Sequence, residues 1–211
     1  MNSKQKRIFI AGIDTNVGKT VASAIICTAL KADYWKPVQT GSIEGTDSDF
    51  IRYVCGGDVV VHASSYCYRE PVSPHYAASL ENDYIHIEKI NIPETDNVLI
   101  IEGAGGLMVP LNEEFLLIDL IKRWNIPVLL VSKNYLGSIN HTLLSCSALK
   151  ATGLETLGIL FNGVETPSSE SIIEKYSQLP VLGRINQTEN ITKEFIYAEA
   201  ERLKHFLGQL L

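Results

Sequence analysis

The sequence predicts an α/β protein with a mainly parallel sheet and helices on both faces of that sheet. Short apolar runs alternate along the chain with amphipathic or Ala-rich segments, and parallel neighbours need such crossover segments between them. The chain has 211 residues, of which 45% are hydrophobic and 20% charged, enough to bury one sizeable core. We therefore expect a single domain over 1–211.

The apolar runs are short enough to be buried strands of such a sheet. They cover 7–11, 34–38, 98–101, 128–131 and 157–161. Four helix candidates lie between or after them, each followed closely by a turn residue or by the opening of a strand, at 18–32, 115–124, 139–151 and 168–177. The last segment, 192–209, places apolar residues among charges, as an amphipathic helix that closes the fold would do.

Two stretches interrupt this alternation, at 40–49 and 66–97. Both carry Gly, Pro, Ser and charged residues. Irregular segments of this composition run over the surface and often carry the residues of a functional site. We expect them to be site loops and excursions from the sheet.

Composition excludes several classes of function. The formal net charge is −6, from 24 acidic and 18 basic residues spread along the chain, which leaves no basic face for a polyphosphate backbone, so nucleic acid is not an expected partner. No run approaches the 18 apolar residues of a membrane span, and the first residues do not resemble a signal peptide. The four cysteines lie far apart without a Cys-x-x-Cys pair. A cytoplasmic protein with reduced thiols and no membrane partner is expected.

The strongest local signal is a glycine-rich loop that follows the first predicted strand and opens an Ala-rich helix. It runs Gly-Ile-Asp-Thr-Asn-Val-Gly-Lys-Thr from Gly12 to Thr20. Backbone N–H groups of such a P-loop hold phosphate oxygens, Lys19 can reach the bridge between the β- and γ-phosphates, and the Thr20 hydroxyl can bind Mg²⁺. Five residues rather than the usual four separate Gly12 from Gly18. A chance Gly-Lys-Thr is the alternative, and the coincidence of strand, loop and helix argues against it.

A second candidate follows the apolar run 98–101 and reads Glu-Gly-Ala-Gly-Gly from Glu102 to Gly106. Ligands of open α/β sheets bind at the carboxyl ends of the strands. An acid there can hold Mg²⁺, while glycines let a ligand approach the backbone. The alternative is a tight turn with a solvated Glu102.

Single residues near the predicted strand ends complete the candidates. Lys36 ends the second predicted strand, where a site role competes with that of a solvated edge lysine. Asp47 and Asp49 precede a short helix near 50–54; we interpret Asp47 as an ordinary N-cap residue and Asp49 as the carboxylate available to a metal. His75 is interpreted as structural. The absence of a Gly-x-Ser-x-Gly elbow and of a paired-His motif disfavours covalent hydrolase and zinc chemistry.

Taken in order, five motifs resemble those of the dethiobiotin synthetases over most of the chain. They are the loop Gly12 to Thr20, Lys-Pro-Val-x-Thr-Gly from Lys36, Glu-Pro-x-Ser-Pro-His from Glu70, Glu-Gly-Ala-Gly-Gly from Glu102, and Leu-Gly-Ser-Ile-Asn-His from Leu136. Either the loop or the Glu102 motif alone would indicate only the wider P-loop superfamily, so the order and spacing of the five decide the assignment.

The resemblance implies closure of a ureido ring at the expense of ATP. One amine of 7,8-diaminopelargonate takes up CO2 as a carbamate, the γ-phosphate is transferred to the carbamate oxygen, and the second amine attacks the mixed anhydride to give dethiobiotin, ADP and phosphate. Catalysis of this kind is mostly positioning and charge stabilisation.

The resemblance also assigns roles to residues. It places Lys19, Lys36 and Thr15 at the carbamate and γ-phosphate as catalytic residues, and Thr20, Asp49 and Glu102 at Mg²⁺. Nucleotide contacts would come from Asp14, Thr15, Asn16, Val17, Gly18, Lys19, Thr20, Glu102, Gly105 and Asn162. Diaminopelargonate contacts would come from Lys36, Thr40, Gly103, Ala104, Gly105, Leu136, Gly137, Ser138 and Asn140.

A homodimer with shared active sites is the partner that the resemblance implies. The Leu136 motif opens the helix predicted at 139–151, and we expect Ser138 to be its N-cap. Free N–H groups at that positive end suit a carboxylate, so the resemblance places the acid end of diaminopelargonate there, across the dimer.

Two departures from the family pattern concern the nucleotide. Asn16 stands where the family frequently has Glu, and no Pro-aromatic pair follows Ile185 to wall the nucleobase. The sequence therefore leaves GTP or CTP open beside ATP.

Three other functions stay open as alternatives. A regulatory switch of the chromosome- or septum-positioning type would share sheet and P-loop, but it carries an additional early lysine where this loop reads Ile-Asp-Thr from Ile13. A cobyrinate-type amide synthetase would need a further glutamine-hydrolysing domain. A non-catalytic nucleotide-binding module would release no phosphate in response to diaminopelargonate and bicarbonate.

Overall fold

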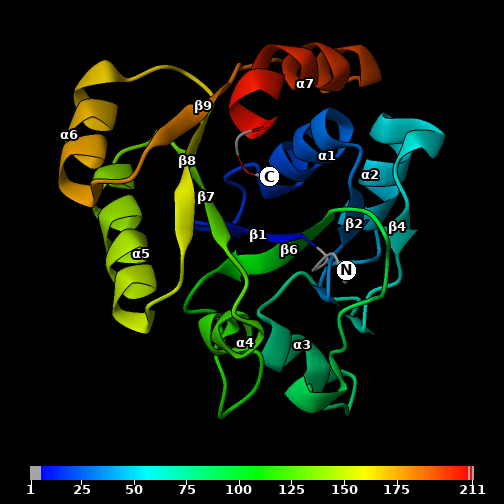
Figure 1. Ribbon diagram of the computed structural model, residues 1–211. Helices are drawn as coiled ribbons and strands as arrows, with labels where there is room; N and C mark the ends of the chain where they lie inside the picture. The colour runs from blue at the N-terminus through cyan, green and yellow to red at the C-terminus, as the bar shows by residue number, and fades with distance from the viewer. Residues whose placement is uncertain (1–5, 209, 211) are drawn as a thin grey trace, which may run out of the picture.

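The computed structural model, which describes residues 6–208 and 210, has a central sheet of seven parallel strands (Figure 1). The strand order is β4-β2-β6-β1-β7-β8-β9. Their bounds are β1 Arg7–Gly12, β2 Asp33–Trp35, β4 Val61–His62, β6 Leu99–Gly106, β7 Val128–Lys133, β8 Thr156–Asn162 and β9 Val181–Ile185. The predicted α/β class with a mainly parallel sheet is confirmed.

Seven α-helices of the described chain surround the sheet. They are α1 Lys19–Leu30, α2 Asp47–Cys55, α3 Pro74–Leu80, α4 Leu117–Trp124, α5 Ser138–Thr152, α6 Pro167–Ser177 and α7 Lys193–Gly208. Figure 1 shows α1, α2 and α7 together over one face, α3 and α4 on the other side, and α5 beside α6 near β7 and β8. The five helix candidates all form, and within the described residues their ends lie at most two residues from the predicted ones; residue 209 of the last candidate lies outside the described residues. The short helix expected near 50–54 forms as α2.

The core explains why the central strands read as continuous apolar runs. In β1, Phe9 and Ile10 are fully buried, and so are Ile100 and Ile101 in β6, because helices cover both faces of a parallel sheet. The ring of Trp35 in β2 packs against Trp124 at the end of α4, with 5.7 Å between centroids.

The strand predicted over 34–38 is divided, which corrects the prediction. β2 ends at Trp35, and a separate strand β3, Val38–Gln39, pairs with β5, Tyr66–Cys67, in a second sheet of two strands. Pro37 lies between them; it has no N–H to give to a ladder, and its carbonyl accepts from the N–H groups of Ser65 and Tyr66 instead. The chain therefore leaves the main sheet after Trp35.

The two irregular stretches contain more structure than the sequence indicates. The second holds β5, α3 and the 3₁₀ turn η2, Ile87–Lys89, while α2 begins inside the first and continues into the turn η1, Gly56–Asp58. The short strands β4 and β9 were not predicted. Short strands at the edges of a sheet give only a weak sequence signal.

The order of the strands determines where a ligand can bind. β1 lies between β6 and β7, with β2 and β4 beyond β6 on one side and β8 and β9 beyond β7 on the other. The loop after β1 therefore opens where the strand order changes direction. Ligands bind at such points, outside the carboxyl ends of the strands. Within the described residues, the helices are too short or too polar for any of them to span a bilayer.

Candidate active site

The P-loop forms between β1 and α1, as the sequence predicts. The helix begins at Lys19, and Gly18 is its N-cap residue with a φ of 94°, a conformation that favours glycine. A Cβ atom on Gly18 would also collide with the side-chain amide of Asn162. Strain and lack of space both require glycine here.

Lys19 is buried beneath the loop, with 6% of its surface exposed. Its Nζ atom donates to the carbonyl of Asp14 at 2.9 Å. The ammonium is therefore held against the P-loop, whose backbone would bind the phosphates. Burial lowers the pKa of Lys19 to about 8, although the nearby Glu102 carboxylate opposes this.

Glu102 is completely buried in β6, at the level of Ile10 in β1. The strand continues to Gly106, so the alternative of a tight turn with a solvated glutamate is wrong. Its Oε1 atom accepts from the Thr20 hydroxyl at 2.9 Å and from the Lys36 ammonium at 3.1 Å. The P-loop helix and the end of β2 thus meet at this one carboxylate.

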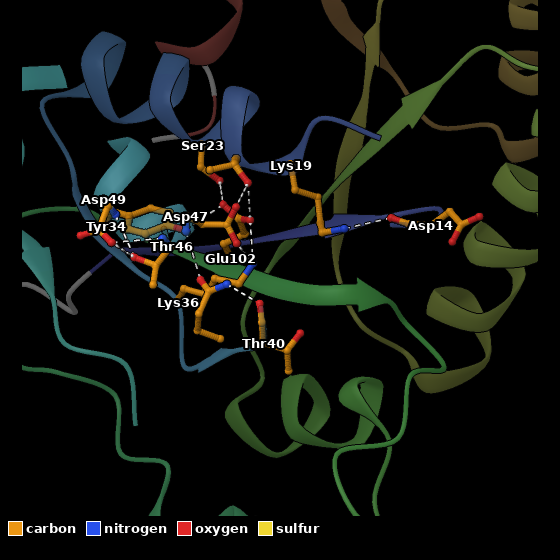
Figure 2. Close-up of polar contacts among 12 residues, drawn as sticks. Asp14, Lys19, Ser23, Tyr34, Lys36, Thr40, Thr46, Asp47, Asp49 and Glu102 are labelled. Atoms are coloured by element: carbon orange, nitrogen blue, oxygen red, sulfur yellow. Dashed lines mark hydrogen bonds and ion pairs between the residues drawn. The ribbon is translucent and has the colours of Figure 1, made fainter. Parts of the chain in front are cut away.

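Lys36 lies between two acids rather than in solvent. Its Nζ atom is 2.6 Å from Asp47 Oδ2 and 3.1 Å from Glu102 Oε1, and only 5% of the residue is exposed (Figure 2). Burial alone would lower the pKa of Lys36, but the two carboxylates outweigh it, so that the pKa is raised. The ammonium therefore stays charged at neutral pH.

The roles expected for the two aspartates at the start of α2 are exchanged: Asp49 belongs to the helix cap, and Asp47 faces the site. Thr46 is the N-cap of α2, and Asp49 completes a capping box by accepting from the Thr46 N–H and hydroxyl. Asp49 also pairs with Arg52 at 2.9 Å and is exposed. The prediction that Asp47 is an ordinary capping residue is therefore wrong.

Asp47 instead reaches the residues around Lys36. Besides its contact with Lys36, its Oδ1 atom accepts from the Thr20 hydroxyl at 2.7 Å. Its backbone N–H donates to Gln39 Oε1 at 3.2 Å, which fixes the start of α2 against β3. Since Asp49 contacts neither Thr20 nor Glu102, the geometry favours Asp47 over Asp49 as the second acid of this group.

A cavity of about 970 Å³ opens over this group. Among the residues that the structure describes, Lys19 and Lys36 are the cationic side chains that line it. Of the residues singled out from the sequence, it brings together Thr15, Asn16, Gly18, Lys19, Thr20, Lys36, Thr40, Asp47, Asp49, Glu102, Ala104 and Gly105.

Other predicted residues lie outside this cavity. Gly103 does not line it: a Cβ there would meet Phe9 and Leu117 at 3.0 Å, so Gly103 faces the core. His75 is exposed in the first turn of α3 and also lies outside the lining. Asp14 and Val17 belong to the P-loop without lining the cavity.

The segment Leu136 to Asn140 likewise lies apart from the cavity, at the start of α5. Gly137, with a φ of 102°, is the N-cap residue, and the N-terminus has no side-chain cap. Ser138 is the first helical residue and is buried, so the prediction that it is the N-cap is wrong. Leu136 is fully exposed.

Asn162 ends β8 next to the P-loop. Its Nδ2 atom donates to the carbonyl of Val17 at 2.9 Å. After Ile185, where the sequence lacks a Pro-aromatic pair, Asn186 donates to the carboxylate of Glu199 in α7. The chain therefore turns towards α7 at this point.

Sequence reasoning missed three buried polar residues around the site. Ser23 and Tyr34 both donate to Glu102 Oε2, and Gln39 holds Asp47. Ser23 lies three residues after Thr20 on the same helix, and Tyr34 two residues before Lys36 on an extended segment, so helix and strand periodicity could have found them.

The donor set at this point suits Mg²⁺ that also binds nucleotide phosphates. The Thr20 hydroxyl lies within hydrogen-bond distance of the carboxylates of both Asp47 and Glu102. The Lys36 ammonium contacts the same two carboxylates. Mg²⁺ in nucleotide sites takes one or two carboxylates together with phosphates and water. The described residues contain no group of three or more His, Cys, Asp or Glu side chains that could hold a metal ion.

Comparisons with known proteins agree with this geometry. A family model described as an AAA domain matches residues 6–194. A protein of Christiangramia forsetii is 47% identical over 97% of this chain and 99% of its own length, and one of Lawsonia intracellularis is 46% identical over 89% and 91%. Both are named ATP-dependent dethiobiotin synthetase BioD.

Solved structures with the same fold are more distant in sequence. A ParA family ATPase of Chlorobium tepidum has a TM-score of 0.60 at 16% identity, covering 96% of this chain and 93% of its own. The MinC:MinD cell division complex of Aquifex aeolicus gives 0.61 at 14% identity, covering 97% and 95%. At such low identity the likeness concerns the fold alone.

Proposed function

The chain belongs to the family of ATP-dependent dethiobiotin synthetases, and from this premise we propose how its own residues form dethiobiotin from 7,8-diaminopelargonate, CO2 and ATP. The chain is an ATP-dependent ligase of biotin biosynthesis. The observation that carries the proposal is the convergence of Lys19, Lys36 and Glu102 at one cavity after the P-loop. The cytoplasm is the proposed location.

The two lysines have separate tasks in this proposal. Lys19, at the first turn of α1, neutralises charge between the β- and γ-phosphates during transfer. Lys36, held at the cavity lining by its two acids, stabilises the carbamate while one of its oxygens attacks the γ-phosphorus. Thr15 and Thr40 line the same cavity and would hydrogen-bond the phosphate and the carbamate.

We propose Asp14 to Thr20, together with Gly105 and Asn162, as the nucleotide contacts, with ATP as the phosphate donor. Asn162 supports this because its amide lies directly against Gly18. The chain after Ile185 offers no aromatic wall, so we propose that the base is selected weakly, with GTP or CTP as further donors.

Thr20, Asp47 and Glu102 would hold Mg²⁺, with Asp47 in place of the Asp49 proposed from the sequence. Bound Mg²⁺ supplies charge neutralisation on the phosphate oxygens. The chain's own contribution is to fix the three oxygen donors before the nucleotide arrives, through the contacts of Lys36, Ser23 and Tyr34.

A homodimer with shared sites completes the proposal. Within the described residues, the cations that line the cavity are Lys19 and Lys36, and both are assigned here to the phosphates and the carbamate, so the distant carboxylate of diaminopelargonate needs another partner. The uncapped N-terminus of α5 in a second subunit would provide N–H groups, and the fully exposed Leu136 would be covered in the dimer. Leu136, Gly137, Ser138 and Asn140 form that segment.

The direct test is product formation by the purified chain. We expect dethiobiotin, ADP and phosphate in equal amounts, only when diaminopelargonate, bicarbonate, ATP and Mg²⁺ are all present. Lys19→Ala is the control and should lose at least about a thousandfold in rate, near 4 kcal/mol. Phosphate release that ignores diaminopelargonate would support the alternative of a switch ATPase with the same fold.

A further inference from the structure

We propose that Tyr34, assisted by Ser23, is a positioning residue that holds the Glu102 carboxylate in the orientation needed to bind a divalent cation. The two oxygens of Glu102 have different partners. Oε1 faces the cavity side, where Thr20 and Lys36 donate to it. Oε2 faces inward and accepts from the Tyr34 hydroxyl at 2.9 Å and from Ser23 at 3.0 Å (Figure 2).

Tyr34 reaches Glu102 because of the register between β2 and β6. Tyr34 pairs with Ile100, and Glu102 lies two residues further along β6, hence on the same face of the sheet. Such diagonal neighbours are within reach of an aromatic side chain. The Tyr34 ring is fully buried, so its hydroxyl needs a partner in the interior.

Ser23 approaches the same oxygen from the P-loop helix. It lies three residues after Thr20 in α1 and is fully buried, so both hydroxyls point from one helix face towards β6. Thr20 donates to one oxygen of Glu102 and Ser23 to the other. The carboxylate is therefore fixed by one donor from β2 and two from α1, in addition to Lys36.

The division of donors has a consequence for the cation. Because Oε2 is occupied by two inward donors, the carboxylate cannot turn about its terminal torsion without breaking both of these bonds. Terminal torsions of this kind are otherwise broad. Oε1 is thereby kept towards Thr20 and Lys36, both of which also contact Asp47.

This inference rests on the proposed function, since it concerns the cation that accompanies the nucleotide. It is tested without turnover. The full chain with Tyr34→Phe, with Ser23→Ala and with both changes is mixed with ADP, and the affinity of the protein–ADP complex for Mn²⁺ is measured by electron paramagnetic resonance. Tyr34→Phe keeps the ring and removes only the hydroxyl.

We expect the dissociation constant for Mn²⁺ to rise about tenfold in the double variant, equal to about 1.4 kcal/mol, and less in each single variant. The affinity for ADP without Mn²⁺ should stay unchanged. The matched control is Tyr68→Phe, which removes another buried tyrosine hydroxyl, one that donates to Asp83 at 2.8 Å and lies outside the cavity lining. It should bind Mn²⁺ as the unaltered chain does.

Mn²⁺ affinity within twofold of the unaltered chain in all three variants, with melting temperatures showing that they are folded, would overturn the proposal. So would an equal loss in Tyr68→Phe, because that would indicate general loosening. If Tyr34→Phe does not fold, Ser23→Ala decides alone by the same criterion. A chain that makes no dethiobiotin would reject the proposed function, while the Mn²⁺ comparison would still decide the role of Tyr34.

Discussion

The Nζ atom of Lys36 lies 2.6 Å from an oxygen of Asp47 and 3.1 Å from an oxygen of Glu102, so one buried cation joins two acids from different elements. Glu102 comes from the centre of the sheet and Asp47 from the first turn of α2. Removing one member of such a group leaves the remaining charges with less compensation. The first prediction follows from this relationship.

Asp47→Asn should impair the reaction much more than Asp49→Asn. Asp47 contacts Thr20 and Lys36, whereas Asp49 caps α2. We expect Asp47→Asn to lower kcat/KM by at least about a hundredfold, near 2.7 kcal/mol, and to raise the Mg²⁺ concentration that gives half-maximal rate.

Asp49→Asn is the matched control at the other end of the same turn. It should keep activity within about threefold and lower the free energy of unfolding by about 1 kcal/mol at most, since it weakens only a cap and an exposed ion pair. Equal losses of activity in the two variants, measured by steady-state kinetics over a Mg²⁺ titration, would contradict the assignment.

The affinity for ADP should fall as the pH rises above about 8. Burial lowers the pKa of Lys19 to about 8, so this ammonium loses its proton there, while the pKa of Lys36 is raised and Lys36 keeps its charge. Phosphates favour the charged form of Lys19, so the dissociation constant should increase up to about tenfold per pH unit above that point.

Calorimetric titration of the ligand-free chain with ADP between pH 7 and pH 9.5 measures this, because the lysine and not the ADP phosphates titrates in that window. An affinity that stays constant over the whole range would show that Lys19 remains protonated and that burial does not control its charge.

Discrimination among nucleotides should be weak. Asn162 reaches Val17, and after Ile185, where no Pro-aromatic pair follows, Asn186 donates to Glu199 in α7. A base left in solvent gains little selectivity, so ATP, GTP and CTP should differ in kcat/KM by less than about a hundredfold. A larger preference for ATP in steady-state kinetics would mean that another segment covers the base.

Subunits with different lesions should restore each other's activity. One batch carries Lys19→Ala, and the other carries Leu136→Asp with Asn140→Asp, which places negative charge at the exposed start of α5 where the substrate carboxylate would bind. In a mixed dimer with shared sites, one site carries both lesions and the other is intact.

Activity should therefore reappear when the two inactive batches exchange subunits. Mass spectrometry of the intact dimers establishes that exchange has taken place. Mixed dimers without any recovered activity would mean that each site is built from a single chain.

The sequence predicts the sheet and the P-loop well because both depend on local patterns. The apolar runs of β1, β6, β7 and β8 and the glycines of the loop are visible along the chain. The sequence could bring Lys36 and Glu102 together only through the general rule that the carboxyl ends of parallel strands lie at the same edge of the sheet. Their direct contact depends on β2 lying next to β6, which no local pattern specifies.

The wrong predictions of capping residues occur where the backbone geometry decides which of two adjacent residues caps a helix. The pattern from Thr46 to Asp49 is that of a capping box, and recognising it would have left Asp47 free to face the site. At α5, the positive φ of Gly137 starts the helix one residue earlier than a serine cap would. Tyr34 looked like an ordinary core residue, because its partner lies 68 positions away.

The central claim is that the γ-phosphate is transferred to a carbamate oxygen, and oxygen tracing tests it most directly. Carbon dioxide labelled with ¹⁸O is supplied with diaminopelargonate and ATP, and the reaction is stopped before hydration exchanges the CO2 oxygens with water. The released phosphate is then analysed by mass spectrometry. When the second amine displaces the phosphate, the bridging oxygen leaves with phosphorus. One ¹⁸O atom per phosphate, and one in the ureido carbonyl of dethiobiotin, is the predicted result. Phosphate whose fourth oxygen comes from water would contradict the account.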